Sequence, residues 1–198
     1  SAISYDKKSI ESFEYMTLAL IQLKKFQEAS DVASDAVGNS KNARIYYLKG
    51  VALDSLKNYK DASYSFNRAV FYDSKSIDAH IGAAFTFSKL NEYDKAMASI
   101  DKGIAIDDKN IAVLLMRADI NLEHSNNVKA IDDVSKVITL TADKPEYYIK
   151  RANIYQSINQ HQNSIADYTK ALQMNKDDYN VYYYRAKAFE ALLDYKSA

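Results

Sequence analysis

The sequence predicts an all-α protein made of stacked helical hairpins, and three observations lead to this prediction. Apolar residues recur at spacings of three, four and seven residues, which places them on one face of a helix. The 198 residues include one proline and four glycines, too few for the many turns of a β-rich fold. Consecutive segments of equal length, such as 43–76 and 77–110, also align with one another without gaps, which indicates an array of similar modules.

The aligned segments are 34 residues long, and this period divides the chain into repeats. Positions within a repeat are numbered from its first residue, which is position 1. About five full repeats are expected, at 10–42, which has one residue fewer, and at 43–76, 77–110, 111–144 and 145–178. Residues 1–9 align with the tail of a preceding repeat, and 179–198 align with the start of a sixth. Natural arrays normally finish with a polar capping helix, and neither end shows one. We therefore expect a single array over 1–198 that is a fragment of a longer one.

Small residues recur at positions where two helices have to approach closely. Position 8 holds Thr17, Gly50, Ala84, Ala118, Ala152 and Ala186. Position 20 holds Ala29, Ala62, Ala96, Ala130, Ser164 and Ala198. Large apolar side chains stand between them, and position 11 holds Leu20, Leu53, Phe87, Tyr155 and Phe189, with Asn121 as the exception. Small residues facing large ones let neighbouring helices interlock, so these positions form the predicted core.

Each repeat is expected to contain two antiparallel helices joined by a short connector such as Lys57-Asn58. First helices are predicted near 10–23, 43–56, 77–90, 111–124, 145–158 and 179–192. Second helices are predicted near 26–39, 60–73, 94–107, 128–141 and 162–175, and Ala198 is expected to lie just inside the sixth. Pro145 falls at the start of a first helix, where its missing N–H costs little.

The order of these positions resembles the tetratricopeptide repeat family. The best-matching stretches are LKGVALDSLKNYKDASYSFNRAV at 48–70 and RANIYQSINQHQNSIADYTKAL at 151–172. The resemblance covers nearly the whole chain and implies a right-handed α-solenoid, the superhelix of stacked hairpins. One departure is clear, because the family's usual proline near the end of the repeat is replaced by Ser74, Asp108, Ala142 and Lys176.

Composition and motifs argue against several classes of function. The 26 basic and 26 acidic residues cancel, which disfavours nucleic acid as a partner. Most of the 17 tyrosines, among them Tyr46, Tyr148 and Tyr182, occupy repeating core positions rather than a stacking platform. His80, His124 and His161 lie in separate repeats, and the chain has no cysteine, so neither a metal nor a cofactor is expected.

Acidic pairs at 107–108, 132–133 and 177–178 could in principle serve acid–base chemistry, but adjacent residues point in different directions on a helix. Two of the pairs lie between hairpins, where a solvated turn or a helix cap explains them. We therefore expect no catalytic residues and no enzymatic activity.

The resemblance further implies that positions 2, 5, 6, 9, 12 and 13 of the first helices line a concave groove. Its candidate peptide-binding residues are Tyr47, Leu48, Val51, Ile81, Phe85, Leu115, Met116, Asp119, Lys150, Asn153, Tyr183, Tyr184 and Lys187. The family's clamp for the C-terminal carboxylate of chaperones needs a cation at position 5, where Tyr47, Ile81 and Leu115 stand instead. The chaperone tail is therefore disfavoured as a partner.

The predicted function is a protein–protein interaction scaffold that binds a peptide or helix on its concave surface. Two alternatives stay open: a regulatory or substrate-docking arm of a larger enzyme or assembly, and, less favoured, an RNA-binding helical repeat. Self-association through an uncapped end, near Tyr182, Phe189 and Leu193, is a further kind of contact. No apolar run is long enough to span a bilayer and no signal peptide is visible, which leaves the compartment open between cytoplasm and periplasm.

Overall fold

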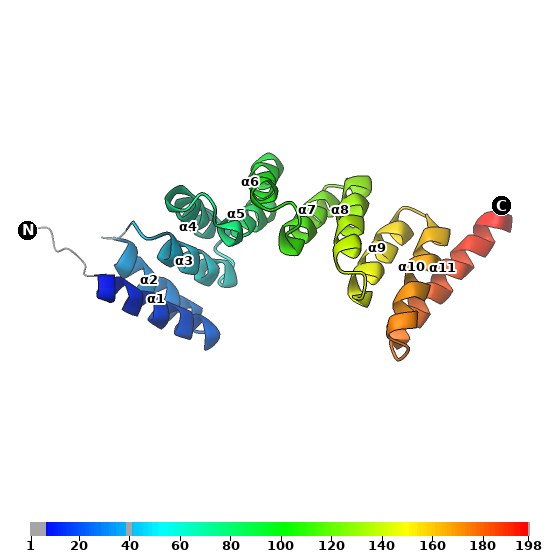
Figure 1. The fold of residues 1–198 in the computed structure, drawn as a ribbon, viewed down its shortest axis with the longest axis horizontal. Coiled ribbons are helices and arrows are strands. Elements are labelled where there is room, and N and C mark those ends of the chain that lie inside the picture. The colour runs from blue at the N-terminus through cyan, green and yellow to red at the C-terminus, as the bar shows by residue number, and fades with distance from the viewer. Residues whose placement is uncertain (1–6, 39–40, 198) are drawn as a thin grey trace, which may run out of the picture. The chain divides into compact units, whose positions relative to one another are not determined.

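A computed structural model of the protein describes residues 7–38 and 41–197, and these ranges contain helices joined by short turns (Figure 1). The first helices of the repeats are α1 (Lys7–Gln22), α3 (Ala43–Ser55), α5 (Ile77–Lys89), α7 (Ile111–Glu123), α9 (Pro145–Ser157) and α11 (Tyr179–Ser197). The second helices are α2 (Phe26–Val37), α4 (Tyr59–Tyr72), α6 (Tyr93–Ile106), α8 (Asn127–Leu140) and α10 (His161–Met174). The predicted all-α architecture of stacked helix hairpins is confirmed.

The helices fall into two compact units, α1–α6 and α7–α11. Within the α1–α6 unit each helix packs against its neighbours in the chain, and the first helix α3 also packs against both α1 and α5. Within the α7–α11 unit, α8 lies against α7 and α9, and α10 lies against α9 and α11. The first helices of the α1–α6 unit therefore form one continuous face of that unit.

The turn between the two helices of a repeat has the same hydrogen-bond pattern in every described hairpin. The residue at position 15 has a left-handed backbone, with φ of 58° to 60° at Lys24, Lys57, Asn91, Ser125 and Asn159. The next N–H then bonds to the carbonyl five residues earlier, as in Asn58 N to Leu53 O at 2.9 Å and Gln160 N to Tyr155 O at 2.8 Å. This pairing is the Schellman motif, which satisfies carbonyls that the helix end would otherwise leave unpaired.

Because a side chain is strained in this conformation, replacing Lys57 with glycine is expected to stabilise the protein. Lys57 has φ 59°, and the Lys57→Gly change should raise the free energy of unfolding by about 1 kcal/mol. Chemical denaturation followed by circular dichroism measures this change. The matched control is Lys102→Gly inside α6, where helical backbone makes glycine unfavourable by about 1 kcal/mol. Equal losses at both positions would contradict the argument.

Capping residues at the N-terminal ends of the first helices explain where several of these helices begin. Asn42, Ser76 and Asn110 each accept a hydrogen bond from the backbone N–H three residues later, at 3.1, 3.3 and 3.2 Å. A side-chain oxygen at the N-cap satisfies one of the free N–H groups of the first turn. Pro145 begins α9, as predicted.

The predicted small positions form the core. At position 20, Ala29, Ala62, Ala96, Ala130 and Ser164 are fully buried, while Ala198 lies outside the described residues. At position 8, Thr17, Ala84, Ala118 and Ala152 are also fully buried, but Ala186, predicted for the core, is exposed. Large side chains fill the spaces between these residues, and Phe66, Ile100, Leu114 and Tyr168 are among the most buried.

Helix ends differ from the prediction in several places. The second helices α4, α6, α8 and α10 begin and end one residue earlier than expected, because the turn needs only the residues that close the Schellman motif. Helix α1 begins at Lys7 rather than at 10, while residues 1–6 of the predicted repeat tail lie outside the described residues.

The expected end of the last first helix near 192 was wrong, because α11 continues to Ser197. Leu193 stands at the position that has a left-handed backbone in the other repeats, and leucine is unfavourable there.

Candidate functional site

The predicted groove residues of the α1–α6 unit lie on α3 and α5, two first helices that pack against each other. Tyr47, Val51, Ile81 and Phe85 are all partly exposed, so they can contact a ligand while their inner atoms remain packed. Together with Asp54 on α3, these residues are called the α3–α5 surface. It is mainly apolar, and Asp54 is its one carboxylate.

Packing behind the α3–α5 surface fixes its aromatic side chains. The Tyr47 ring lies 5.8 Å from the ring of the core residue Phe66, and the Phe85 ring meets that of Tyr59 edge-on at 6.5 Å. The Lys89 ammonium also lies 5.2 Å from the Phe85 ring centroid, within the range of a cation–π interaction. Both rings are therefore held in place before any ligand arrives, which reduces the entropy lost on binding.

Asp54 is the unusual polar group of this surface. Its Oδ1 atom is buried and has no hydrogen-bond partner. Burial raises the pKa of the Asp54 carboxyl, and the positive charge of Lys89 opposes this effect. The residue as a whole is partly exposed, so the Asp54 side chain also forms part of the accessible surface.

A small pocket of about 410 Å³ adjoins Tyr47 at one end of the α3–α5 surface. Its lining includes Arg44 and Asp78, which carry opposite charges. Burial raises the pKa of the Tyr47 hydroxyl, the charge of Asp78 raises it further, and Arg44 lowers it. The Tyr47 hydroxyl is therefore kept protonated and can donate a hydrogen bond.

Leu48 differs from the other predicted groove residues. Its side chain is only 4% exposed, so it belongs to the core beneath the surface and does not reach a ligand. The side chain at position 6 is therefore buried in the repeat at 43–76, whereas the equivalent Met116 and Tyr184 are accessible in the other unit.

In the α7–α11 unit the predicted groove residues are joined into a polar and aromatic network. Lys150 on α9 forms an ion pair with Asp119 on α7. Asn153 accepts a hydrogen bond of 2.6 Å from the Tyr168 hydroxyl, and the Tyr168 ring stacks on Tyr184 of α11 at 6.3 Å. The remaining predicted residues lie partly or fully exposed on the first helices α7 and α11: Leu115, Met116, Tyr183 and Lys187. The structure thus links several of the predicted residues of this unit through direct contacts.

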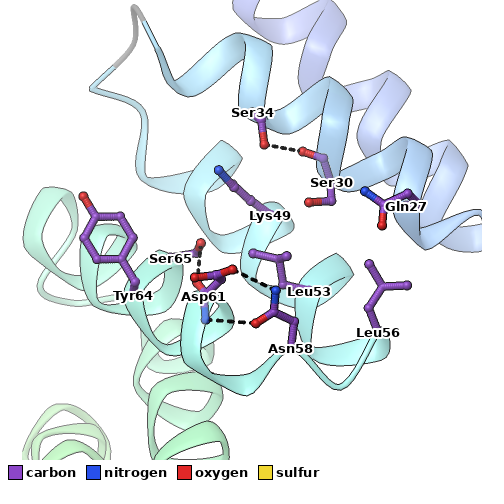
Figure 2. A pocket seen from close by; sticks show the side chains of 10 residues that line it. All are labelled: Gln27, Ser30, Ser34, Lys49, Leu53, Leu56, Asn58, Asp61, Tyr64 and Ser65. Carbon is purple, nitrogen blue, oxygen red and sulfur yellow. Dashed lines mark hydrogen bonds between the residues drawn. The ribbon is translucent and has the colours of Figure 1, made fainter.

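A second, larger pocket opens on the side of the second helices, between α2 and α4 and over α3 (Figure 2). Its volume is about 760 Å³ and its lining is mostly polar, including Ser34, Lys49 and Ser65. Lys49 stands at position 7 and Ser65 at position 23 of their repeat. In the repeats at 111–144 and 145–178 these two positions hold an arginine and an aspartate, whose longer side chains meet each other.

Those arginine–aspartate pairs are the polar feature that sequence reasoning missed. Arg117 binds both oxygens of Asp133 at 2.9 and 2.6 Å, and Arg151 binds both oxygens of Asp167 at 2.7 and 2.8 Å. Both aspartates are buried. The signal was present in the sequence, because arginine at position 7 is followed by aspartate at position 23 in two consecutive repeats. The two side chains come into contact only once the hairpin is folded.

The groups considered for chemistry have structural roles. His80 is buried and its Nε2 lies 3.1 Å from the Ser74 carbonyl oxygen, consistent with the predicted packing role. Asp178 accepts a hydrogen bond from the Val181 N–H at the start of α11, as a cap. Over the residues that the structure describes, no group of three or more side chains is arranged to bind a metal ion. No described helix is both long and apolar enough to cross a bilayer.

The fold and these surfaces define a class of protein, the helical-hairpin repeat protein. Sequence profiles described as tetratricopeptide repeat match residues 18–79, 77–110 and 145–178. The chain belongs to the tetratricopeptide repeat family. Repeats of this family generally serve as non-catalytic modules for protein interaction.

Solved structures of low sequence identity share the fold. MamA (41-end) from Desulfovibrio magneticus RS-1 is 14% identical with a TM-score of 0.76, covering 89% of this chain and 99% of MamA. PilF of Pseudomonas aeruginosa is 12% identical with a TM-score of 0.76, covering 96% of this chain and 87% of that one. YrrB, described as a TPR protein with an unusual peptide-binding site, is 14% identical with a TM-score of 0.70, covering 92% and 98%. A comparison with curated proteins finds no significant match.

Proposed function

We propose that this chain is a non-catalytic scaffold that binds a segment of a partner protein on its first helices. The α3–α5 surface carries the proposal, because it combines fixed apolar and aromatic side chains with a partly exposed acidic residue, Asp54. Apolar anchors beside a polar group are typical of surfaces that bind an amphipathic helix or an extended peptide.

The expected ligand follows from the chemistry of this surface. Tyr47, Ile81 and Phe85 suit apolar side chains spaced along one face of the ligand. Asp54 suits a donor such as a lysine, an arginine or a backbone N–H. On the α7–α11 unit, Asp119, Lys150, Asn153, Tyr183, Tyr184 and Lys187 offer a second, more polar and aromatic set of contacts for the same class of partner. YrrB, which shares this fold, is described as having an unusual peptide-binding site.

The experiment is a peptide-display selection against the full chain, followed by affinity measurements on the enriched peptides. Truncating both Tyr47 and Phe85 to alanine is expected to weaken binding at least about 30-fold, the hot-spot scale of roughly 2 kcal/mol. The enriched peptides should combine apolar residues with a basic one.

Two further variants provide a control and a second test of the same surface. Tyr64→Ala removes an exposed aromatic ring from the second helix α4 and should leave affinity unchanged. Ile81→Lys places a charge on the surface without deleting a ring that supports the core, and it should weaken binding as well. If peptides bind equally to the wild type, to the double alanine variant and to Ile81→Lys, all with intact helicity, the proposed surface is wrong.

A further inference from the structure

The polar pocket between α2 and α4 contains a cation that has no partner among the described residues (Figure 2). Lys49 lines this pocket from α3 and is only partly exposed. Its ammonium group takes part in no hydrogen bond and no ion pair with any residue that the structure describes. An ammonium group carries three N–H donors and no acceptor. A positive charge and three donors are therefore available to a ligand in the pocket.

Ser30 on α2 adds a second donor to the same pocket. The residue is only 5% exposed, and its hydroxyl has no hydrogen-bond partner in the described part of the chain. Figure 2 shows this side chain pointing into the pocket. The hydroxyls of Ser34 and Ser65 are already used, because they donate to the backbone carbonyls of Ser30 and Asp61 at 2.6 and 2.9 Å. The pocket thus offers the Lys49 ammonium and the Ser30 hydroxyl to an acceptor.

The equivalent place in another repeat is filled by a carboxylate. Lys49 and Ser65 stand at positions 7 and 23, where the repeat at 145–178 has Arg151 and Asp167. There the Asp167 carboxylate accepts two hydrogen bonds from the arginine, at 2.7 and 2.8 Å. The Ser65 side chain is too short to reach in the same way, and no ion pair joins these two positions in the repeat at 43–76.

The side of the preceding repeat also matches. Arg151 donates a hydrogen bond of 2.9 Å to Ser135, which stands at position 25 of the repeat before it. Position 25 before Lys49 is Ser34, which lines the pocket, and Figure 2 shows Lys49 between Ser34 and Ser65. Both basic residues therefore have a serine on the preceding second helix, and the pocket differs in lacking the carboxylate.

We propose that this pocket binds a carboxylate group of another molecule, in the place that the Asp167 carboxylate takes in its own repeat. One carboxylate oxygen accepts from the Lys49 ammonium and the other from the Ser30 hydroxyl. Leu56 and Tyr64 also line the pocket and are 39% and 63% exposed, so an apolar group next to the carboxylate has surface to contact. The ligand class is an acidic group with an apolar neighbour, from a peptide side chain or a small organic acid.

An acidic residue in the lining favours a carboxylate over a phosphate. Asp61 lines the pocket, and its Oδ2 atom accepts a hydrogen bond of 2.8 Å from the Asn58 side-chain amide. It forms no ion pair with Lys49 among the described contacts. Repulsion by Asp61 grows in proportion to the charge of the ligand. A group with one negative charge therefore suits a pocket with one free cation and one nearby carboxylate better than a doubly charged phosphate does.

This pocket is separate from the α3–α5 surface. Lys49 is two residues from both Tyr47 and Val51, which places it about 200° away from them around the helix. The two sites also favour opposite charges, because the α3–α5 surface is expected to bind a basic residue and the pocket an acidic one. Truncating both Tyr47 and Phe85 to alanine should therefore leave carboxylate binding unchanged, and the two proposals can fail independently.

The test is an NMR titration of the isotope-labelled full chain at low salt with the capped tripeptide acetyl-Leu-Asp-Leu-amide. The backbone amides of Ser30, Lys49 and Ser65 should shift and reach saturation. Lys49→Ala in the protein, or asparagine in place of aspartate in the peptide, should each weaken binding at least about tenfold. Combining the two changes should cause little further loss, because both remove the same interaction. Ser30→Ala should weaken binding by a smaller factor, since it removes a neutral donor.

Parallel titrations with acetate and with inorganic phosphate identify the source of the carboxylate. Acetate that saturates the same amides as tightly as the tripeptide supports a small organic acid as the ligand. Tighter binding of the tripeptide supports an acidic side chain of a partner. Phosphate that binds these amides more tightly than acetate overturns the assignment to a carboxylate.

Matched variants of the protein separate this site from a general effect of charge or of folding. Ser65→Asp should abolish binding, because its carboxylate pairs with Lys49 as Asp167 pairs with Arg151, whereas Ser65→Asn has the same size without the charge and should keep most of the affinity. Lys49→Arg should retain binding. Lys102→Ala removes an exposed cation of α6 and should change nothing. Absence of saturable shifts, equal affinity for the aspartate and asparagine peptides, or binding that Lys49→Ala leaves unchanged with helicity intact overturns the proposal.

Discussion

Replacing Phe66 with alanine is expected to lower the free energy of unfolding of the α1–α6 unit by about 3–5 kcal/mol. Phe66 on α4 is 3% exposed and its ring lies between the backbones of α3 and α5. A methyl group at Gly50 would come within 2.7 Å of this ring, and one at Gly82 within 2.5 Å. The ring thus occupies a space that two glycines leave open, and its removal would leave a cavity between three helices.

The same geometry predicts that Gly82→Ala destabilises the protein, although alanine in a helix is normally favoured by about 1 kcal/mol. The added methyl would overlap a buried ring that cannot move away, at a cost of about 1–3 kcal/mol. Combining Gly82→Ala with Phe66→Leu should recover part of the loss, because the smaller side chain makes room for the methyl. Urea denaturation, with hydrogen exchange to resolve the α1–α6 unit from α7–α11, measures all three variants. An increase in stability for Gly82→Ala alone would contradict this packing.

Replacing Asp167 with alanine is expected to cost about 3 kcal/mol in the α7–α11 unit. Asp167 and Arg151 are 9% and 19% exposed in their side chains, and the hydrogen bonds to Asp167 raise the pKa of Arg151. Removing the carboxylate leaves a largely buried guanidinium with only the Ser135 hydroxyl as a protein partner among the described hydrogen bonds. Hydrogen exchange of the α9 and α10 amides should report the loss, since Arg151 joins α9 to both α8 and α10.

The control for this prediction is the Lys150–Asp119 ion pair, whose lysine lies on the same helix as Arg151. Its side chains are 30% and 50% exposed, and ion pairs in contact with water contribute about 0–1 kcal/mol. Lys150→Ala should therefore change stability little. Replacing Arg151 by methionine and Asp167 by leucine together should restore most of the stability lost in Asp167→Ala, because no buried charge then lacks a partner. Equal effects at the exposed and the buried pair would show that burial does not control their contribution.

The helices could be predicted from the sequence because the signals for them are local and repeated. Residues at positions 8 and 20 are small in nearly every repeat, and the structure buries most of them as expected. The pattern failed at α11, which continues through Leu193. A turn in this fold requires a left-handed residue, and the apolar spacing used to place the helices contains no information on backbone φ.

The candidate site could be predicted only in part. Repeat position placed Tyr47, Ile81 and Phe85 on partly exposed first-helix faces, but it also placed Leu48 there, which is buried. The unpaired oxygen of Asp54 could not be predicted, because it depends on which donors the neighbouring helices place beside it. The binding role of all these residues stays a prediction until the experiments above are done.

What the sequence determined by itself is the family, the helical repeat and the identity of the core positions, because an apolar pattern that recurs in every repeat leaves few other ways to bury apolar surface. The tertiary structure decided which polar residues meet. Position 7 and position 23 lie on different helices and become neighbours only when the Schellman turn folds the second helix back on the first. Burial of the resulting ion pairs is a consequence of that packing and not of any local pattern.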